Sequence, residues 1–119
     1  MTLRRSFTLQ DRVRKRSEYR RVYEKGLKIS SKNLVLFYLE NDLRRPRLGM
    51  TVTRRTGGAV QRNRAKRLLR EWFRGNREKL PALDLVINTR EGLHRMSLEA
   101  VSRDMEAVMR RLAAKESRT

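Results

Sequence analysis

The residues best suited to chemistry in this chain lie close together, between positions 54 and 74. This stretch reads RRTGGAVQRNRAKRLLREWFR and holds eight Arg or Lys side chains and a single acid, Glu71. Cations three or four positions apart on a helix repel one another by about 0.2–0.5 kcal/mol per pair. Because arginine presents a planar fork of donors that matches phosphate, we expect the stretch to bind a polyanion whose charge offsets this repulsion.

A helix over residues 59–74 separates these cations from the apolar side chains. At about 100° per residue, the apolar residues share one arc, which we expect to pack against the rest of the protein. This arc comprises Ala65, Leu68, Leu69, Trp72 and Phe73. The opposite arc comprises Asn63, Lys66, Arg67, Arg70 and Arg74, with Arg64 at its edge.

Arg54 and Arg55 stand just before this helix and are followed by Gly57-Gly58. The free N–H groups and the dipole of a helix N-terminus favour phosphate, and glycines let a foreign backbone come close. A turn that needs positive φ explains the same glycines equally well. The sequence leaves both interpretations open.

Positive charge is concentrated around the helix. The chain of 119 residues has a formal charge of +18. Residues 43–77 hold 12 bases and one acid, whereas residues 78–119 hold eight bases and seven acids. A generic solvated surface would spread its charge, so this distribution favours a nucleic-acid-binding protein.

The sequence offers little for a protein active site. It has no cysteine, which excludes disulfides, Cys-based zinc sites and thiol nucleophiles. The one histidine, His94, falls in a predicted loop, and the acids are scattered rather than clustered for metal-dependent hydrolysis. We interpret Asp84 as a strand-entry residue and Glu71 as a partner of Arg67 and Arg74. No catalytic residue and no metal ligand is predicted on the protein.

The surrounding pattern predicts an α+β fold. We expect one domain over residues 1–119, a compact two-layer sandwich in the order α-β-β-β-α-β-α with helices on a small mixed sheet. The expected elements are a short helix capped by Ser17 and ended by Gly26, strands at 27–30, 33–40 and 47–53, the helix at 59–74 ended by Gly75, a strand at 82–89, a loop at 90–95 and a helix capped by Ser97.

Three segments carry further expectations. The strand at 33–40 is apolar on both faces and is therefore placed inside the sheet. Residues 1–16 are basic and are expected to be irregular, with Phe7 and Val13 as anchors. The final helix has a core-facing stripe made of Leu98, Val101, Met105, Val108 and Leu112.

Membrane insertion is not expected. The apolar runs, such as LVLFYLE and LDLVINT, are far shorter than a bilayer span requires. The N-terminus MTLRRSFTLQDRVRKR lacks the apolar central region of a signal peptide. We expect a cytoplasmic protein.

A small aromatic group forms a second candidate site. Tyr19 and Tyr23 are one turn apart on the first helix, and Val35 and Phe37 share one strand face. An aromatic platform between them would stack unpaired bases, which contributes about 1–3 kcal/mol per base. Aromatics at these spacings also occur as ordinary core residues, and the spacing alone does not decide between the two.

The stretch GGAVQRNRAKRLLREWFR resembles the signature of the bacterial ribonuclease P protein subunit. That signature is an Arg-Asn-Arg followed by Lys-Arg, Arg and often Glu along one helix. The similarity extends to RVRKRSEYRRVYEKG, to the strands LVLFYL, RLGMTV and LDLVI, and to the basic C-terminal helix. Two departures are mild: Tyr stands at 19 and 23 where the family often has Phe, and Val13 stands where Leu is usual. The matching positions are Arg62, Asn63, Arg64, Lys66, Arg67, Arg70 and Glu71.

The resemblance implies a protein that is not itself the catalyst. In this family a large RNA with bound Mg²⁺ hydrolyses a phosphodiester bond of precursor tRNA and releases the 5′ leader. The expected partners are therefore ribonuclease P RNA and precursor tRNA, with Mg²⁺ held mainly through RNA and the protein monomeric alone. The family fold also implies an unusual left-handed βαβ crossover.

Two RNA-binding surfaces follow from the resemblance. The surface for the catalytic RNA comprises Arg54, Arg55, Arg62, Asn63, Arg64, Lys66, Arg67, Arg70 and Arg74. The cleft for the 5′ leader comprises Arg12, Tyr19, Tyr23, Val35 and Phe37.

Two other classes remain as alternatives. A ribosomal or other structural RNA-binding protein would have the same charge pattern without a role in cleavage. A DNA-binding protein would place the arginine-rich helix in the major groove. The cationic arc offers few residues suited to reading base edges, which disfavours the DNA-binding class.

Overall fold

The fold is described for residues 7–116 of a computed structural model. Within this range the helices are α1 (Arg16–Lys25), α2 (Ala59–Asn76) and α3 (Leu98–Glu116), and the strands are β1 (Leu27–Ser30), β2 (Leu34–Glu40), β3 (Arg47–Thr51) and β4 (Leu83–Thr89). Short 3-10 turns are η1 (Leu9–Asp11), η2 (Arg54–Thr56), η3 (Arg77–Lys79) and η4 (Leu93–Arg95). The order of helices and strands is the predicted one.

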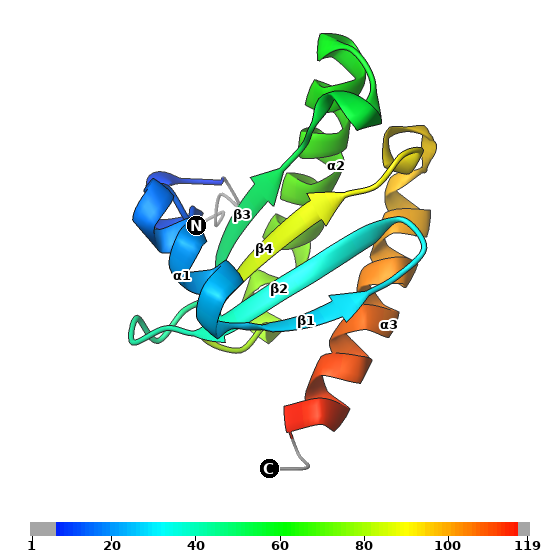
Figure 1. The fold of residues 1–119 in the computed structure, drawn as a ribbon. Helices are drawn as coiled ribbons and strands as arrows, with labels where there is room; N and C mark the ends of the chain where they lie inside the picture. Colours follow the sequence, from blue (N-terminus) through cyan, green and yellow to red (C-terminus); the bar gives the residue numbers. More distant parts are fainter. Residues whose placement is uncertain (1–6, 117–119) are drawn as a thin grey trace, which may run out of the picture.

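The four strands form one mixed sheet in the order β1-β2-β4-β3. β4 pairs parallel with β3 and antiparallel with β2, and β1 pairs antiparallel with β2. In Figure 1 the parallel strands β3 and β4 point upward, and β4 lies to the right of β3. The chain connects them through α2, which lies on the far side of the sheet. This crossover is left-handed, whereas about 98% of such connections are right-handed. The mixed sheet and the left-handed crossover are both as expected.

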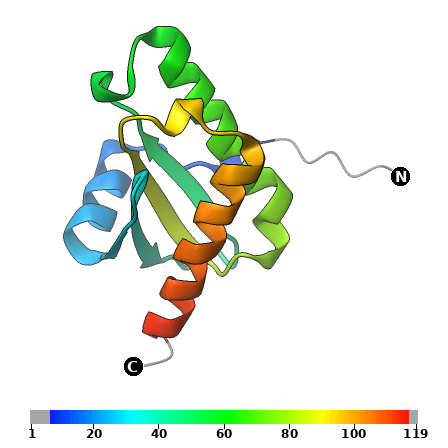
Figure 2. The same cartoon turned by 90° about the vertical axis from the view of Figure 1, so that its right-hand side faces the viewer.

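The helices cover both faces of the sheet. Figure 2 shows α1 on one side of the sheet and α2 and α3 on the other. Leu34, Leu36 and Tyr38 of β2 are buried in the large core beneath α2 and α3. On the opposite face, Phe37 and Leu39 of β2 pack against a smaller cluster beneath α1 that contains Val22 and Val86. β2 therefore packs on both faces, which confirms its predicted position inside the sheet.

α2 folds because its apolar arc packs on the sheet. Ala65, Leu68, Leu69, Trp72 and Phe73 are all buried, as predicted. Burial of each large side chain contributes about 1.5–3 kcal/mol, which exceeds the repulsion among the outward cations. The expected end at Gly75 is wrong, because the helix continues through Gly75 to Asn76. There the Asn76 side-chain amide donates to the Trp72 carbonyl at 2.8 Å and satisfies one of the last carbonyls.

The beginning of α1 also differs from the prediction. The N-cap is Lys15 rather than Ser17, because the Glu18 carboxylate accepts the N–H groups of Arg14 and Lys15 at 2.9 and 3.0 Å. In α3, Ser97 is the predicted cap, and its hydroxyl accepts the N–H of Ala100 at 3.1 Å.

Two further expectations are corrected. Leu98, at the start of α3, is 38% exposed rather than part of the core stripe, whereas the other four stripe residues are buried. The predicted loop at 90–95 contains the turn η4. Leu98 precedes the region of α3 that faces the sheet, so burial of the stripe begins one turn later, at Val101.

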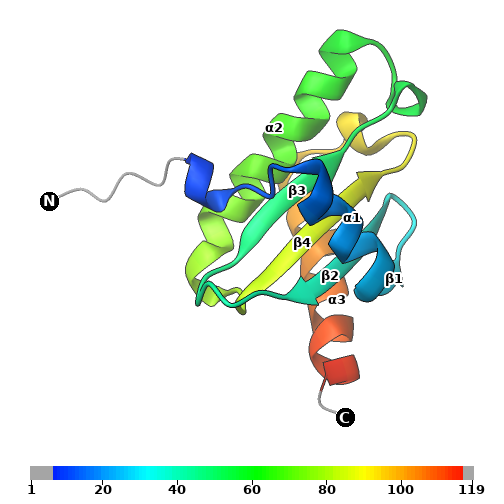
Figure 3. The ribbon, with the colours of Figure 1, turned by 60° about the vertical axis from the view of Figure 1, so that its left-hand side comes forward.

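The segment before α1 is more ordered than predicted. Residues 1–6 lie outside the described part, but η1 follows at Leu9–Asp11, and Arg12 forms a parallel bridge with Leu48 of β3. Both predicted anchors are in place: Val13 is buried, and the rings of Phe7 and Phe73 meet edge-on at 5.7 Å. Figure 3 shows this segment crossing the edge of β3 between α2 and α1.

No helix in residues 7–116 combines the length and the apolar character that a membrane span needs.

Candidate nucleic-acid interface

The outward side of α2 presents the cations that the sequence places on one arc. We call this the arginine face, made of Asn63, Lys66, Arg67, Arg70 and Arg74. Four of these residues, with Phe7 from the N-terminal segment, line a hollow of about 380 Å³, which we call the outer hollow. The helix therefore brings the predicted cations to one concave surface. The four residues are Asn63, Arg67, Arg70 and Arg74.

A second hollow, of about 310 Å³, lies between α2, the N-terminal segment and α1. We call it the inner hollow, and it shares Phe7 and Arg70 with the outer one. Among the described residues, no acid lines either hollow. The inner hollow is lined by Phe7, Arg12, Val13, Arg14, Tyr19, Leu48, Met50, Lys66 and Arg70.

Arg70 is the residue common to both hollows. Its Nε is buried and has no hydrogen-bond partner among residues 7–116. Desolvation lowers the pKa of its guanidinium, and the positive charges of Arg12 and Arg74 lower it further. Such a group is stabilised by an anion that supplies both charge and acceptors.

Arg62 and Arg64, the two arginines of the Arg-Asn-Arg motif, have a different environment from the arginine face. Arg62 donates to the Gly57 carbonyl at 3.2 Å. Arg64 donates through Nε to the His94 carbonyl at 2.6 Å and through Nη2 to the Met96 carbonyl at 3.3 Å. These contacts tie the ends of the neighbouring loops to α2, so Arg62 and Arg64 have a structural role that the motif did not predict.

The turn η2, just before α2, contains the remaining two predicted cations. Arg54 and Arg55 are exposed in η2, next to the beginning of α2. Gly57 has φ of 140°, a conformation that other residues adopt only with strain. The structural explanation for this glycine is therefore sufficient.

Glu71 does not have the role that was predicted. Among the described residues, the ion pairs are formed by Glu18, Asp84 and Asp11, and Glu71 forms none with Arg67 or Arg74. Asp84 does lie near the start of β4, where it is buried and paired with Arg47. The arginine face is therefore not neutralised by the neighbouring carboxylate of α2.

The predicted leader residues divide between two places. Arg12 and Tyr19 line the inner hollow, beside Lys66 and Arg70. The Tyr19 hydroxyl accepts the Met50 N–H at 3.1 Å. Its ring lies so close to Gly49 that a Cβ there would be 3.0 Å from it, so any other residue at this position would require the Tyr19 ring to shift.

The other three predicted leader residues form a group toward β2. The rings of Tyr23 and Phe37 meet edge-on at 4.8 Å. The Tyr23 hydroxyl donates to Asn88 Oδ1 at 2.7 Å and lies 2.7 Å from Thr51 Oγ1. Val35, Asn88 and Thr51 are direct neighbours across three strands. We call this half-buried group the platform; it comprises Tyr23, Val35, Phe37, Thr51 and Asn88.

Asn88 and Thr51 were missed in the sequence, although a signal for Asn88 was present. Alternation along β4 places Asp84, Val86 and Asn88 on the same face, toward α1. Asn88 is the half-buried polar residue of this series near the end of β4, where the face toward α1 becomes accessible to solvent. Thr51 has no comparable signal, because its position depends on the register between β3 and β4.

No metal site is formed by the described side chains. Residues 7–116 contain no cluster of three or more His, Cys, Asp or Glu that would hold a metal ion. The buried carboxylates Asp11 and Asp84 are paired with Arg77 and Arg47. The donor set of the described residues does not fit a Mg²⁺ site.

Comparisons with known proteins agree with this geometry. A family model described as Ribonuclease P matches residues 7–113. The Ribonuclease P protein component of Syntrophus aciditrophicus (strain SB) is 40% identical over 110 residues, covering 92% of this chain and 89% of that protein. The relative from Pelotomaculum thermopropionicum is 35% identical over 102 residues, covering 85% of this chain and 91% of its own length.

Solved structures show the same fold. The Staphylococcus aureus RNase P protein superposes with a TM-score of 0.78 at 28% identity, covering 84% of this chain and 93% of that chain. The protein from Thermotoga maritima gives a TM-score of 0.76 at 28% identity, covering 84% and 96%. With a family match over nearly all described residues, the chain belongs to the ribonuclease P protein family.

Proposed function

We propose that this protein binds ribonuclease P RNA through the arginine face and the 5′ leader of precursor tRNA through the inner hollow and the platform. Members of the family are the accessory protein subunit of an endoribonuclease that matures the 5′ end of tRNA. This protein is such a subunit, and ribonuclease P RNA is its partner. The proposal assigns a surface to each RNA.

The observation that carries the proposal is that the two hollows share Arg70 and Phe7 in their linings. Phosphates of an RNA bound on the arginine face and those of a strand bound near α1 would both approach this guanidinium. Arg12, Arg14 and Lys66 extend the positive charge from Arg70 toward the platform. There the half-buried rings of Tyr23 and Phe37 offer an aromatic surface for an unpaired base.

Mg²⁺ and the oligomeric state of the protein are the remaining parts of the proposed function. Mg²⁺ is expected in the assembled enzyme through the RNA, where phosphates supply the oxygen ligands that it prefers. We further propose a cytoplasmic protein that is monomeric until it binds RNA, since a charge of +18 opposes self-association.

Stimulated cleavage tests the proposal. The purified chain is added to a bacterial ribonuclease P RNA and labelled precursor tRNA at low Mg²⁺ concentration. We expect faster release of the 5′ leader than with RNA alone, because the protein neutralises phosphates that repel one another. A ribosomal or other structural RNA-binding protein would bind RNA without accelerating cleavage, and that result would contradict the proposal.

A further inference from the structure

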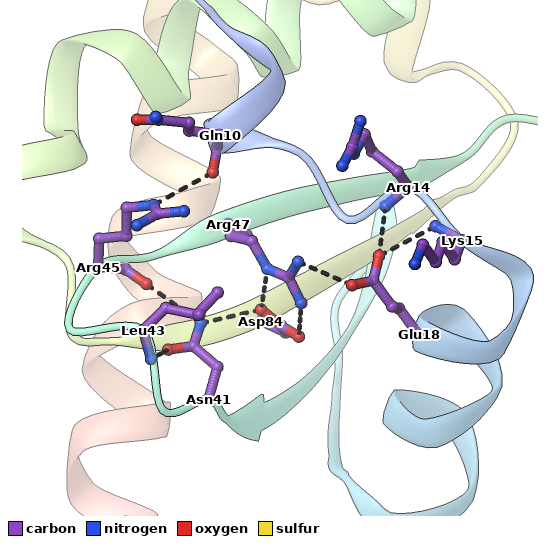
Figure 4. Close-up of polar contacts among 9 residues, drawn as sticks. All are labelled: Gln10, Arg14, Lys15, Glu18, Asn41, Leu43, Arg45, Arg47 and Asp84. Carbon is purple, nitrogen blue, oxygen red and sulfur yellow. Dashed lines mark hydrogen bonds and ion pairs between the residues drawn. The ribbon is translucent and has the colours of Figure 1, made fainter.

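Polar contacts tie the segment before α1 to the sheet. Glu18 accepts the N–H groups of Arg14 and Lys15 with one carboxylate oxygen and binds Arg47 Nη1 with the other, at 2.9 Å. Arg47 in turn holds Asp84 with two parallel hydrogen bonds of 2.8 and 2.7 Å. Figure 4 shows the resulting chain of contacts from the N-terminal segment, through α1 and β3, to β4.

A second set of contacts returns from Asp84 to the same segment. Asn41 donates to Asp84 Oδ1 at 2.9 Å and to the Arg45 carbonyl at 3.1 Å. Arg45 Nε then donates to the Gln10 carbonyl at 3.3 Å (Figure 4). One end of these contacts is at Gln10 and the other is at Arg14 and Lys15, so the backbone of residues 10–15 closes them into a ring. We call it the polar ring.

The central members of the ring are charged and well protected from solvent. The side chains of Asp84 and Arg47 are 3% and 14% exposed. The pKa of Glu18 falls to about 2, chiefly because its carboxylate accepts the Lys15 N–H, with further contributions from Arg14 and Arg47. The hydrogen bond to Asp84 is the main reason that the pKa of Arg47 is raised. Glu18 is thus ionised at neutral pH, and its bonds are charge-assisted.

The N-terminal segment that the polar ring holds carries cations that are repelled by the cations of α2. Arg12 and Arg14 line the inner hollow together with Lys66 and Arg70, and no described acid lines it. In the absence of a bound anion, this repulsion favours movement of the segment away from α2. The bridge from Arg12 to Leu48 and the buried Val13 oppose that movement, and the polar ring holds both sides of the segment.

We propose that Glu18, Arg47 and Asp84 are positioning residues for RNA recognition, because they hold Arg12 and Arg14 in the inner hollow before RNA binds. This inference rests on the proposed function, in which the inner hollow receives RNA. None of the three residues needs to touch RNA. Their contribution is to lower the cost of ordering the two arginines at the moment of binding.

Glu18→Gln is the variant that tests the inference. Glu18 is half-buried on α1, and replacing it leaves the Arg47–Asp84 pair intact. Arg47→Ala would instead leave the buried Asp84 carboxylate without its cationic partner and endanger the fold. Glu24→Gln is the matched control, because Glu24 is exposed on the same helix and the change in charge is identical. Melting curves establish that each variant is folded.

The measurement is the affinity of the reconstituted holoenzyme for precursor tRNA. Removal of an acid from a cationic protein generally strengthens RNA binding, so Glu24→Gln should bind as tightly as the parent or slightly more tightly. Glu18→Gln should bind about three- to tenfold more weakly, which is the lower part of the range of coupling within one hydrogen-bond network. In a background that carries both Arg12→Ala and Arg14→Ala, Glu18→Gln should have no further effect.

Two results would overturn the inference. One is a Glu18→Gln holoenzyme that binds precursor tRNA like the Glu24→Gln control. The other is an equal loss from Glu18→Gln in the parent and in the background without the two arginines, since this would show that Glu18 acts independently of them. Either result leaves stimulated cleavage by the parent protein unaffected, so the proposed function stands or falls separately.

Discussion

Arg70 carries a positive charge that the described part of the protein does not neutralise. Its Nε is buried without a partner, and its charged neighbours are Arg12 and Arg74. Burial of a cation in such surroundings is unfavourable unless an anion completes the site. The residue that lines both hollows is therefore the one at which the proposed function predicts a bound phosphate to be stabilising.

Glu18 provides a test at the residue scale through its pH dependence. Its pKa is lowered from 4.5 to about 2 in the folded protein. The ionised carboxylate therefore stabilises the fold above pH 4.5, and this contribution is lost as the pH falls toward 2. We predict that Glu18→Gln lowers the free energy of unfolding more at pH 6 than at pH 3, measured by urea denaturation at both pH values.

A difference between parent and Glu18→Gln that stays constant from pH 6 to pH 3 would show that the carboxylate has the same pKa in the folded and unfolded states. The polar ring would then contribute little to holding the N-terminal segment.

At the residue scale, the sequence predicted side chains that act through helical periodicity and missed those that act through tertiary contacts. The arginine face follows from the 3.6-residue repeat. In contrast, Arg64 donates to carbonyls of a loop 30 and 32 positions away, and Asn88 accepts from Tyr23 65 positions away. No local sequence pattern specifies pairs so far apart, so none of these three hydrogen bonds could be predicted.

At the scale of elements, α2 combines two functions on opposite faces. Its apolar face holds the large core together, and its outward face is free to carry uncompensated cations because core packing supplies the stability. The N-terminal segment and α1 bring additional cations and aromatics to the inner hollow, which α2 also lines. In the proposed function, recognition of RNA depends on how these elements are placed relative to α2.

Arg67→Ala tests the outward face of α2. We predict weaker binding of ribonuclease P RNA and a log–log salt slope that is smaller by about 0.7–0.9 for each phosphate that the variant no longer neutralises. Binding is measured at several salt concentrations. Arg103→Ala on α3, which also removes an exposed arginine from a helix, is the control and should change the slope little. If the two variants behaved alike, the charge of the whole protein rather than the arginine face would determine binding.

The sequence located each element but not all of its ends. Strong periodicity identified the helices, and the two-sided apolar pattern placed β2 inside the sheet. The end of α2 at Asn76 and the beginning of α1 at Arg16 depend on particular side-chain caps, in which Asn76 and Glu18 replace the residues expected from propensity. The handedness of the crossover came from the family resemblance, since general rules favour the opposite hand.

At the scale of the whole molecule, net charge links stability to ligand binding. A charge of +18 on 119 residues opposes compaction, and any anion that binds only the folded state stabilises it by mass action. We predict that millimolar sulfate or phosphate raises the melting temperature more than chloride does at equal ionic strength. Arg70→Ala should reduce this difference. An equal response of the parent to all three anions would indicate screening without a specific site.

The central claim is that the protein holds two RNAs on two adjoining surfaces that meet at Arg70, and Phe37→Ala tests it most directly. Affinities of the reconstituted holoenzyme are measured for precursor and mature tRNA, with melting curves to establish that the variant is folded. Loss of one stacked base should weaken precursor binding by about 1–3 kcal/mol and leave mature tRNA binding nearly unchanged. Arg67→Ala should instead weaken assembly, with a defect that diminishes when protein is in excess. A folded Phe37→Ala holoenzyme that lost affinity for both tRNAs equally, or for neither, would contradict the account.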